Sequence, residues 1–466
     1  MQPTATEPKS WTTGDLLEAA AQSRLAYVLL AAVAAVALGV LVLTVRLKVV
    51  AVVAVIGGAS LLALVRPDLG LLALIVFDAA ELSRAASASS PFTAVRIFGA
   101  LTLLSWLARG GSPGVGRRLQ SPQLTFLLGY FLVAALSIFY APHPELSMPI
   151  IREYFMIFLL FLLLVALARS EWHLQAISWT LVGAAVISIG LAMRQYEPHM
   201  ERLASSQSNP NYFALHLVAV LPLAFYLAVA ERRALVRVGM LGLALLIMGA
   251  IAKTYSRGAF LGMALVVVVL IVHLLRYPRR SMRRLVVPVL GVLVVGTVLL
   301  PAGYMDRVRS IASSPGTQDL SIYRRRQTNR ATWQMFLDHP LLGVGLGNST
   351  PLSVVYRPQI GIERAPHNIV LEVASETGVL GLLCFALAVG FAGADFARAA
   401  GHYRRRANWL MYALCSAYLV GLGGFMVTAL FKTATVVRVL WTMVAISVVA
   451  RNLVAQELRA GEPEAP

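Results

Sequence analysis

Cysteine and charged side chains are scarce in this sequence. The two cysteines, Cys384 and Cys415, both lie inside apolar runs, so neither a disulfide framework nor a thiolate metal site is expected. Charged residues make up 13% of the 466 residues, whereas hydrophobic residues reach 58%. A soluble domain carries about twice that share of charge. The composition therefore excludes a soluble protein and indicates a polytopic membrane protein.

Lysine is also rare, so the abundance of arginine is weak evidence for a phosphate-binding site. Of the 40 basic residues only four are lysines, at 9, 48, 253 and 432. The preference for arginine is therefore global and is no sign by itself of bidentate phosphate contacts in one segment. A basic cytoplasmic rim explains most of the formal net charge of +18, so we expect no nucleic-acid partner.

Near-continuous apolar runs of about twenty residues recur along the chain, which is typical of membrane-spanning helices and not of barrel strands. The expected spans are 26–45, 48–65, 93–108, 122–140, 150–168, 173–193, 212–230, 235–252, 257–275, 285–303, 378–397, 408–430 and 433–450. A weaker apolar run covers 69–77. We expect an all-α protein with about 12 to 14 transmembrane helices and one long, partly helical periplasmic loop.

The apolar runs also predict the division of the chain. The expected segments are a polar N-terminal segment (1–25), N-terminal transmembrane helices (26–303), a periplasmic catalytic loop (304–377), C-terminal transmembrane helices (378–454) and a tail (455–466). The polar N-terminal segment lacks the pattern of a cleaved signal peptide, so we expect it to be retained.

Basic residues predict the orientation in the bacterial inner membrane, because positive charge marks the cytoplasmic side. They gather in alternate connections, at 109–118, 232–237, 276–284 and 398–406. The other connections are then expected on the periplasmic side, and the C-terminus inside. The orientation of the N-terminus depends on whether 69–77 spans the membrane.

The long connection from about Tyr304 to His367 is unusually basic for a periplasmic loop. It holds eight arginines and ends in Pro366-His367-Asn368. Positive charge on the outer face runs against its usual placement, so the loop indicates an anionic substrate.

Four clusters fall on the expected periplasmic face, in a fixed order with spans between them. They are Arg202 with Asn209-Pro210-Asn211-Tyr212-Phe213-Ala214, then Tyr255-Ser256-Arg257-Gly258-Ala259, then Arg330 and Trp333 with His339-Pro340-Leu341-Leu342-Gly343-Val344-Gly345-Leu346-Gly347-Asn348, then His367-Asn368 with Glu372, Glu376, Gly378 and Gly381. In this order they resemble the O-antigen ligase and Wzy-type polymerase-like family of membrane glycosyltransferases. The resemblance covers roughly 194–383.

The resemblance implies a GT-C-like helical enzyme that moves a glycan from a polyprenyl (undecaprenyl) diphosphate carrier to an acceptor at the periplasmic face. It implies inverting transfer with no metal and no other cofactor. The residues are consistent with this chemistry. His367 can act as the base, since an imidazole is partly unprotonated near neutral pH. Arg202, Arg257, Arg330 and Arg326 can hold the leaving diphosphate.

Each of these residues also has a plainer interpretation. His367 could cap the helix that begins near Asn368, and Arg257 could anchor the membrane interface by snorkelling. Arg202 could pair with Glu197 or Glu201 on a solvated loop.

The basic run that contains Arg326 and Arg330 is ambiguous in the same way. A helix would place these two arginines on one face, but a solvated charge run or an attraction to anionic lipid head groups also fits. Glu372 and Glu376 share a helical face as well. One of them could orient the imidazole or pair with an arginine, and simple packing is the alternative.

The glycine-rich segment 343–348 is no nucleotide loop, because no strand precedes it and no Lys-Ser/Thr follows. We expect its glycines to allow a tight turn that packs on the membrane helices.

The acceptor defines the possible functions. Lipid A-core as acceptor corresponds to an O-antigen ligase, which we favour slightly, and a second carrier-linked glycan corresponds to a polymerase. Transfer to a protein hydroxyl is less expected, because no extra soluble domain follows the last span. A lipid-linked oligosaccharide flippase or exporter is the rival from another class, but it should carry charge through the membrane midplane.

Overall fold

The computed structural model describes residues 57–80, 94–196, 202–204, 209–231, 233–276, 291 and 320–460. Within them, all regular secondary structure is helical, which confirms the all-α class. The elements are α4 (Pro67–Ala79), α5 (Ala94–Ala108), α6 (Val115–Leu119), α7 (Pro122–Leu136), η1 (Ser137–Phe139), α8 (Pro144–Leu167), α9 (Glu171–Gln195), α10 (Pro210–Ala230), α11 (Ala234–Lys253), α12 (Arg257–Leu275), α16 (Leu320–Asp338), α17 (Ser349–Tyr356), η2 (Pro358–Ile360), α18 (Ile369–Arg405), α19 (Trp409–Ala429) and α20 (Arg438–Ala460).

Among the described residues, nine helices are long and apolar enough to cross a membrane. The chain is therefore a multi-pass membrane protein. The expected spans 26–45 and 285–303, and part of 48–65, lie outside the described residues. The number of spans, about 12 to 14, stays a prediction.

Polar residues at the starts of the helices set where several of them begin. Asn209, Ser256 and Asn368 each cap a helix, because the side-chain oxygen accepts a hydrogen bond from a backbone N–H of the first turn. In α10 the residue after the cap is proline, whose fixed φ suits the first helical position. All three caps lie next to clusters that the sequence singled out.

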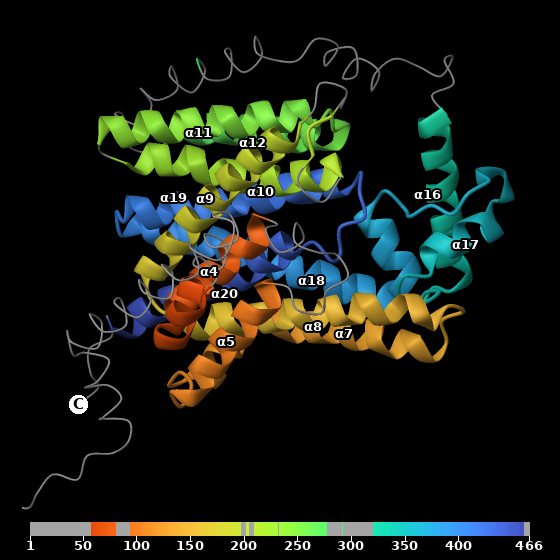
Figure 1. Cartoon of the computed structure of the whole chain (residues 1–466), viewed down its shortest axis with the longest axis horizontal. Coiled ribbons are helices and arrows are strands. Elements are labelled where there is room, and N and C mark those ends of the chain that lie inside the picture. The colour runs from red at the N-terminus through yellow and green to blue at the C-terminus, as the bar shows by residue number, and fades with distance from the viewer. Residues whose placement is uncertain are drawn as a thin grey trace, which may run out of the picture.

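The spans lie side by side in one bundle, in which α10 lies between the α11–α12 pair and α19 (Figure 1). α10 is apolar on all sides and is the most buried of the spans, since it packs against α9, α11, α12 and α19. A helix that is hydrophobic all round is typical of such a position. It begins at the end of the bundle that carries the four clusters.

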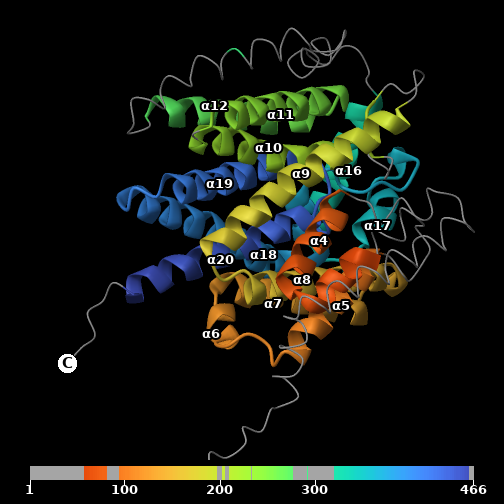
Figure 2. The same cartoon turned by 60° about the vertical axis from the view of Figure 1, so that its left-hand side comes forward.

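Polar contacts gather at the two opposite ends of the bundle. At one end Asn408 donates to Glu171, at 2.9 Å from its nearer carboxylate oxygen, and His402 contacts Glu457 at 2.9 Å. At the other end the connections between the spans contact α16, α17 and α18, and Figures 1 and 2 both place α16 and α17 there. The C-terminal end of α20 lies with the first group. The clusters of interest therefore share one end, opposite the basic connection 398–406.

α18 differs from the expected boundaries. It begins at Ile369, as expected for a helix that starts near Asn368, and ends at Arg405, so it extends beyond the expected span 378–397 at both ends. The helix is interrupted at Gly378, which has φ +63°, and apolarity alone marked only the part beyond this kink. α20 likewise continues to Ala460, into the expected tail.

Candidate functional site

His367 lies immediately before α18 and is half-buried. The cap of α18 is Asn368, whose Oδ1 accepts from the backbone N–H groups of Val370 (2.9 Å) and Leu371 (3.2 Å). The capping role considered for His367 is thus filled by its neighbour. The Nδ1 atom of His367 is buried and has no hydrogen-bond partner within the described part of the chain. The helix therefore does not use the imidazole as its cap.

Three cations lie close enough to His367 to act on its charge. Burial, and then the positive charges of Arg325, Lys432 and Arg364, lower the pKa of His367 to about 4. An imidazole with this pKa is neutral at pH 7 and can accept a proton. The same cations would attract an anion beside it.

Lys432 lies in the connection between α19 and α20 and is 8% exposed. Its Nζ atom lies 4.3 Å from the centroid of the Tyr212 ring, a cation–π contact. Burial and the charges of Arg325 and Arg202 lower the pKa of Lys432, against the opposing effect of Glu372. Lys432 therefore lies between the first cluster, α16 and the start of α18.

Arg202 joins two of the four clusters. Its Nε donates to the carbonyl of Thr254 (2.7 Å) and its Nη2 donates to Oδ1 of Asn211 (3.0 Å). These contacts hold it across the start of α10 and the turn between α11 and α12. Glu197 and Glu201, its alternative partners, lie outside the described residues.

Arg257 is the first residue of α12. The turn before it contains Tyr255 with φ +50°, an uncommon conformation for a residue with a side chain. Gly258 packs so closely on the α19–α20 connection that an added Cβ would lie 2.8 Å from Cβ of Phe431. The second cluster therefore abuts the residue next to Lys432.

The arginines of α16 divide between two faces. The helix buries Gln327, Thr328, Ala331, Thr332 and Met335. Arg325 is half-buried and acts on His367 and Lys432, whereas Arg326 and Arg330 are exposed. The structure thus brings together His367, Arg202 and Arg325, and places the backbone of Arg257 beside them. Arg326 and Arg330 lie on the outer face of α16, and their contact with diphosphate stays a prediction.

Glu372 and Glu376 attach two loops to the first turns of α18. Glu372 accepts from the backbone N–H of Ala434 and from the hydroxyl of Thr435, both at 3.0 Å. Glu376 accepts from the hydroxyl of Ser349 at 2.5 Å. Glu372 therefore fixes the connection that carries Lys432, close to His367, while Glu376 fixes the start of α17.

The glycine-rich segment 343–348 packs directly on the kink of α18, which confirms the tight turn expected from the sequence. Val344 N–H donates to the carbonyl of Ser375 (2.7 Å), and Val379 N–H donates to that of Pro340 (2.7 Å). Gly378 faces this segment so closely that an added Cβ would lie 2.3 Å from the carbonyl carbon of Leu341. Backbone contact at this distance leaves no room for a side chain.

Gly378→Ala is therefore expected to destabilise the site. The positive φ and the backbone clash should together cost at least about 2 kcal/mol, which lowers the apparent unfolding temperature of a chain of this length by about 2 °C or more. Thermal unfolding of the purified protein in detergent measures this. Gly390→Ala in the same helix is the control, because no atom lies within 4 Å of its added Cβ. Equal midpoints for the two variants would contradict the role given to Gly378.

Sequence reasoning missed three cations of this site, namely Arg325, Arg364 and Lys432. Lys432 directly precedes the expected span 433–450, a position that is typical of a basic residue at the membrane interface. The choice of Arg326 over Arg325 rested on its spacing to Arg330, but the buried face of α16 contains three polar residues (Gln327, Thr328 and Thr332), which hide the apolar periodicity. Only a helical-wheel projection centred on Ala331 and Met335 would have indicated which face of α16 is buried.

A comparison with known protein families finds a match in the central region of the chain. Residues 241–386 match the family model described as O-antigen ligase. This region includes α12, α16, α17 and the first part of α18, and so contains Arg257, Arg325 and His367. Arg202 and Lys432 lie outside it. No curated protein matches the chain.

Proposed function

We propose that this chain, whose residues 241–386 match the family model described as O-antigen ligase, transfers a glycan from a polyprenyl diphosphate carrier to an acceptor hydroxyl. The observation that carries the proposal is the position of His367, a neutral imidazole surrounded by Arg325, Arg364 and Lys432. A base next to a cluster of cations suits a reaction in which a hydroxyl loses a proton while an anion departs.

The proposed step is a single displacement. The acceptor oxygen attacks the anomeric carbon, the bond from that carbon to the diphosphate oxygen breaks, and the diphosphate leaves with the electron pair. His367 takes the hydroxyl proton. Arg202, Arg257, Arg325 and Lys432 stabilise the charge that develops on the diphosphate. In this scheme the cations supply the charge neutralisation that a metal would give elsewhere.

The site would face the periplasm of a bacterial inner membrane. The opposite end carries the basic connections, including Arg398 and 404–406, and positive charge favours the cytoplasmic side. The lipid carrier would place its diphosphate at head-group level, where the cations of the site lie at the ends of the spans. A flippase is less well supported, because the excess of positive charge near His367 lies at one end of the bundle, whereas the buried charges of Arg438, Asp78 and Glu153 pair with one another.

The leading candidate acceptor is lipid A-core, which makes the protein an O-antigen ligase, and a second carrier-linked glycan is the alternative. Deletion of the gene separates them. We expect loss of capped lipopolysaccharide and accumulation of long carrier-linked chains, measured by gel analysis of lipopolysaccharide and of the carrier lipids. Products with a single repeat would instead indicate a polymerase, and unchanged glycoconjugates would refute both.

Arg257→Lys tests the diphosphate contact. Lysine keeps the charge but loses the guanidinium fork, so a bidentate contact to diphosphate is lost. We expect the donor KM to rise about tenfold, or ~1.4 kcal/mol, with a smaller change in the acceptor KM. Arg276→Lys at the far end of α12 serves as the control, since Arg276 is exposed there. Equal rises in both KM values would indicate a structural role for Arg257.

A further inference from the structure

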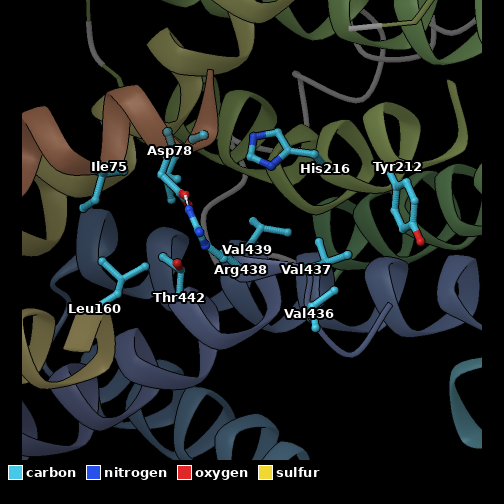
Figure 3. A pocket seen from close by; sticks show the side chains of 12 residues that line it. Ile75, Asp78, Leu160, Tyr212, His216, Val436, Val437, Arg438, Val439 and Thr442 are labelled. Atoms are coloured by element: carbon cyan, nitrogen blue, oxygen red, sulfur yellow. Dashed lines mark hydrogen bonds and ion pairs between the residues drawn. The ribbon is translucent and has the colours of Figure 1, made fainter. Parts of the chain in front are cut away.

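A second polar site lies next to the cation cluster. A cavity of about 210 Å³ is bounded by α4, α10 and the start of α20, with Leu160 of α8 and Leu181 of α9 also in its wall. Figure 3 shows Asp78 and Arg438 meeting on one side of it and His216 and Tyr212 of α10 on another. His367 is not among the residues that line it.

The charged groups of this cavity balance one another. Arg438 pairs with Asp78 and, at 2.7 Å, with Glu153. Glu153 also lies 4.0 Å from Arg96. Among the described residues, these two arginines and two carboxylates in and beside the cavity wall sum to no net charge, in contrast to the cations around His367. The cavity therefore suits a neutral ligand and not a second phosphate.

Two polar atoms in the cavity wall lack protein partners. Nε2 of His216 and Nε of Arg438 are buried, and neither has a hydrogen-bond partner among the residues described here. Buried polar atoms are normally hydrogen-bonded, so these two are available to a ligand that carries hydroxyl or carbonyl groups. The hydroxyl of Thr442, on the same wall, can serve as donor or acceptor.

The volume of the cavity and its apolar side chains further restrict which ligand it can bind. A cavity of about 150 Å³ accommodates one benzene ring, so this volume fits one substituted six-membered ring and no oligosaccharide. Apolar side chains such as Ile75, Leu181 and Val439 complete the wall. A pyranose has apolar C–H faces and a polar rim, which matches such a mixed lining.

The cavity adjoins the cation cluster through Tyr212. This residue lines the cavity, lies under Nζ of Lys432, and its hydroxyl contacts that of Thr433 at 3.0 Å. A group in the cavity is thus next to a group held by Lys432. The sugar of a carrier-linked glycan is bonded directly to the diphosphate, whereas the acceptor hydroxyl must meet His367.

We propose that the cavity between α4, α10 and α20 binds the donor sugar ring that is attached to the carrier diphosphate. This inference rests on the proposed function and adds a subsite that selects the sugar. His216, Thr442 and the Asp78–Arg438 pair contact its hydroxyl groups, while the cations hold only the diphosphate.

The experiment compares the native carrier-linked donor with sugar-free polyprenyl diphosphate. His216→Phe removes the polar ring atoms, and Ala79→Leu fills the cavity from the end of α4. In both variants we expect the donor KM to rise about tenfold, as for the loss of one or two ligand hydrogen bonds. The inhibition constant of sugar-free polyprenyl diphosphate and the acceptor KM should stay within about twofold of wild type, since their contacts are unchanged.

Control variants are His173→Phe, at the opposite end of the bundle, and Ala108→Leu, at the exposed end of α5; both should leave all three constants unchanged. A parallel rise in the inhibition constant would overturn the proposal, because the cavity would then serve the diphosphate or the fold. A rise in the acceptor KM alone, or no change in any constant, would overturn it as well. If wild-type protein neither transfers glycan nor is inhibited by polyprenyl diphosphate, the proposed function itself fails.

Discussion

His367→Ala is expected to abolish glycan transfer while the protein stays folded in the membrane. A positioned general base typically contributes 10²- to 10⁴-fold, so we expect kcat to fall by roughly that factor. Donor binding should persist, because the diphosphate is held by the surrounding cations. Transfer by purified protein, with carrier-linked donor and acceptor, measures the rate, and binding of polyprenyl diphosphate is measured separately.

His143→Ala provides a matched control for this prediction. His143 is an exposed histidine at the same end of the bundle, where its ring contacts Glu145 at 3.3 Å. We expect its removal to leave the rate unchanged. An active His367→Ala variant would eliminate the proposed base. A variant that loses donor binding together with turnover would make His367 a ligand of the diphosphate instead.

Arg325→Ala and Arg326→Ala separate two neighbouring arginines that lie on different faces of α16. Arg325 acts on both His367 and Lys432, whereas Arg326 is exposed. Loss of a charge-assisted contact costs about 1.5 to 3 kcal/mol, so Arg325→Ala should raise the donor KM by roughly ten- to a hundredfold. Arg326→Ala should change it much less. A larger rise in donor KM for Arg326→Ala than for Arg325→Ala would instead support Arg326 as the diphosphate ligand, as its spacing to Arg330 predicts.

The pH dependence gives this pair of variants a second readout. A base must be unprotonated, so the rate falls as pH drops through the pKa of His367. In the free enzyme this pKa is lowered to about 4, and the acid limb of kcat/KM reports the free enzyme. Arg325→Ala removes one of the charges that lower the pKa, so the limb should shift upward, toward 6.5. Arg326→Ala should leave it in place.

Many of the helices were predictable because length and apolarity leave few alternatives in a membrane. The expected span 257–275 coincides with α12, and 212–230 lies within α10. Hydropathy alone misplaces a boundary where a helix continues beyond its apolar run, as in α18, whose first turns carry Glu372 and Glu376. Those turns are helical because Asn368 caps them and the loop segment 340–345 packs on them, and hydropathy registers neither.

The sequence by itself determined the class, the order of the four clusters and the residue types required for the chemistry. Tertiary structure decided which of those residues meet. It brings Arg325 toward His367 and leaves Arg326 exposed, because only one face of α16 packs inward, and it places Lys432, which is remote in sequence from the other clusters, near both. The physical reason is that periodicity and hydropathy are local properties, whereas the pKa of His367 depends on charges contributed by three separate segments.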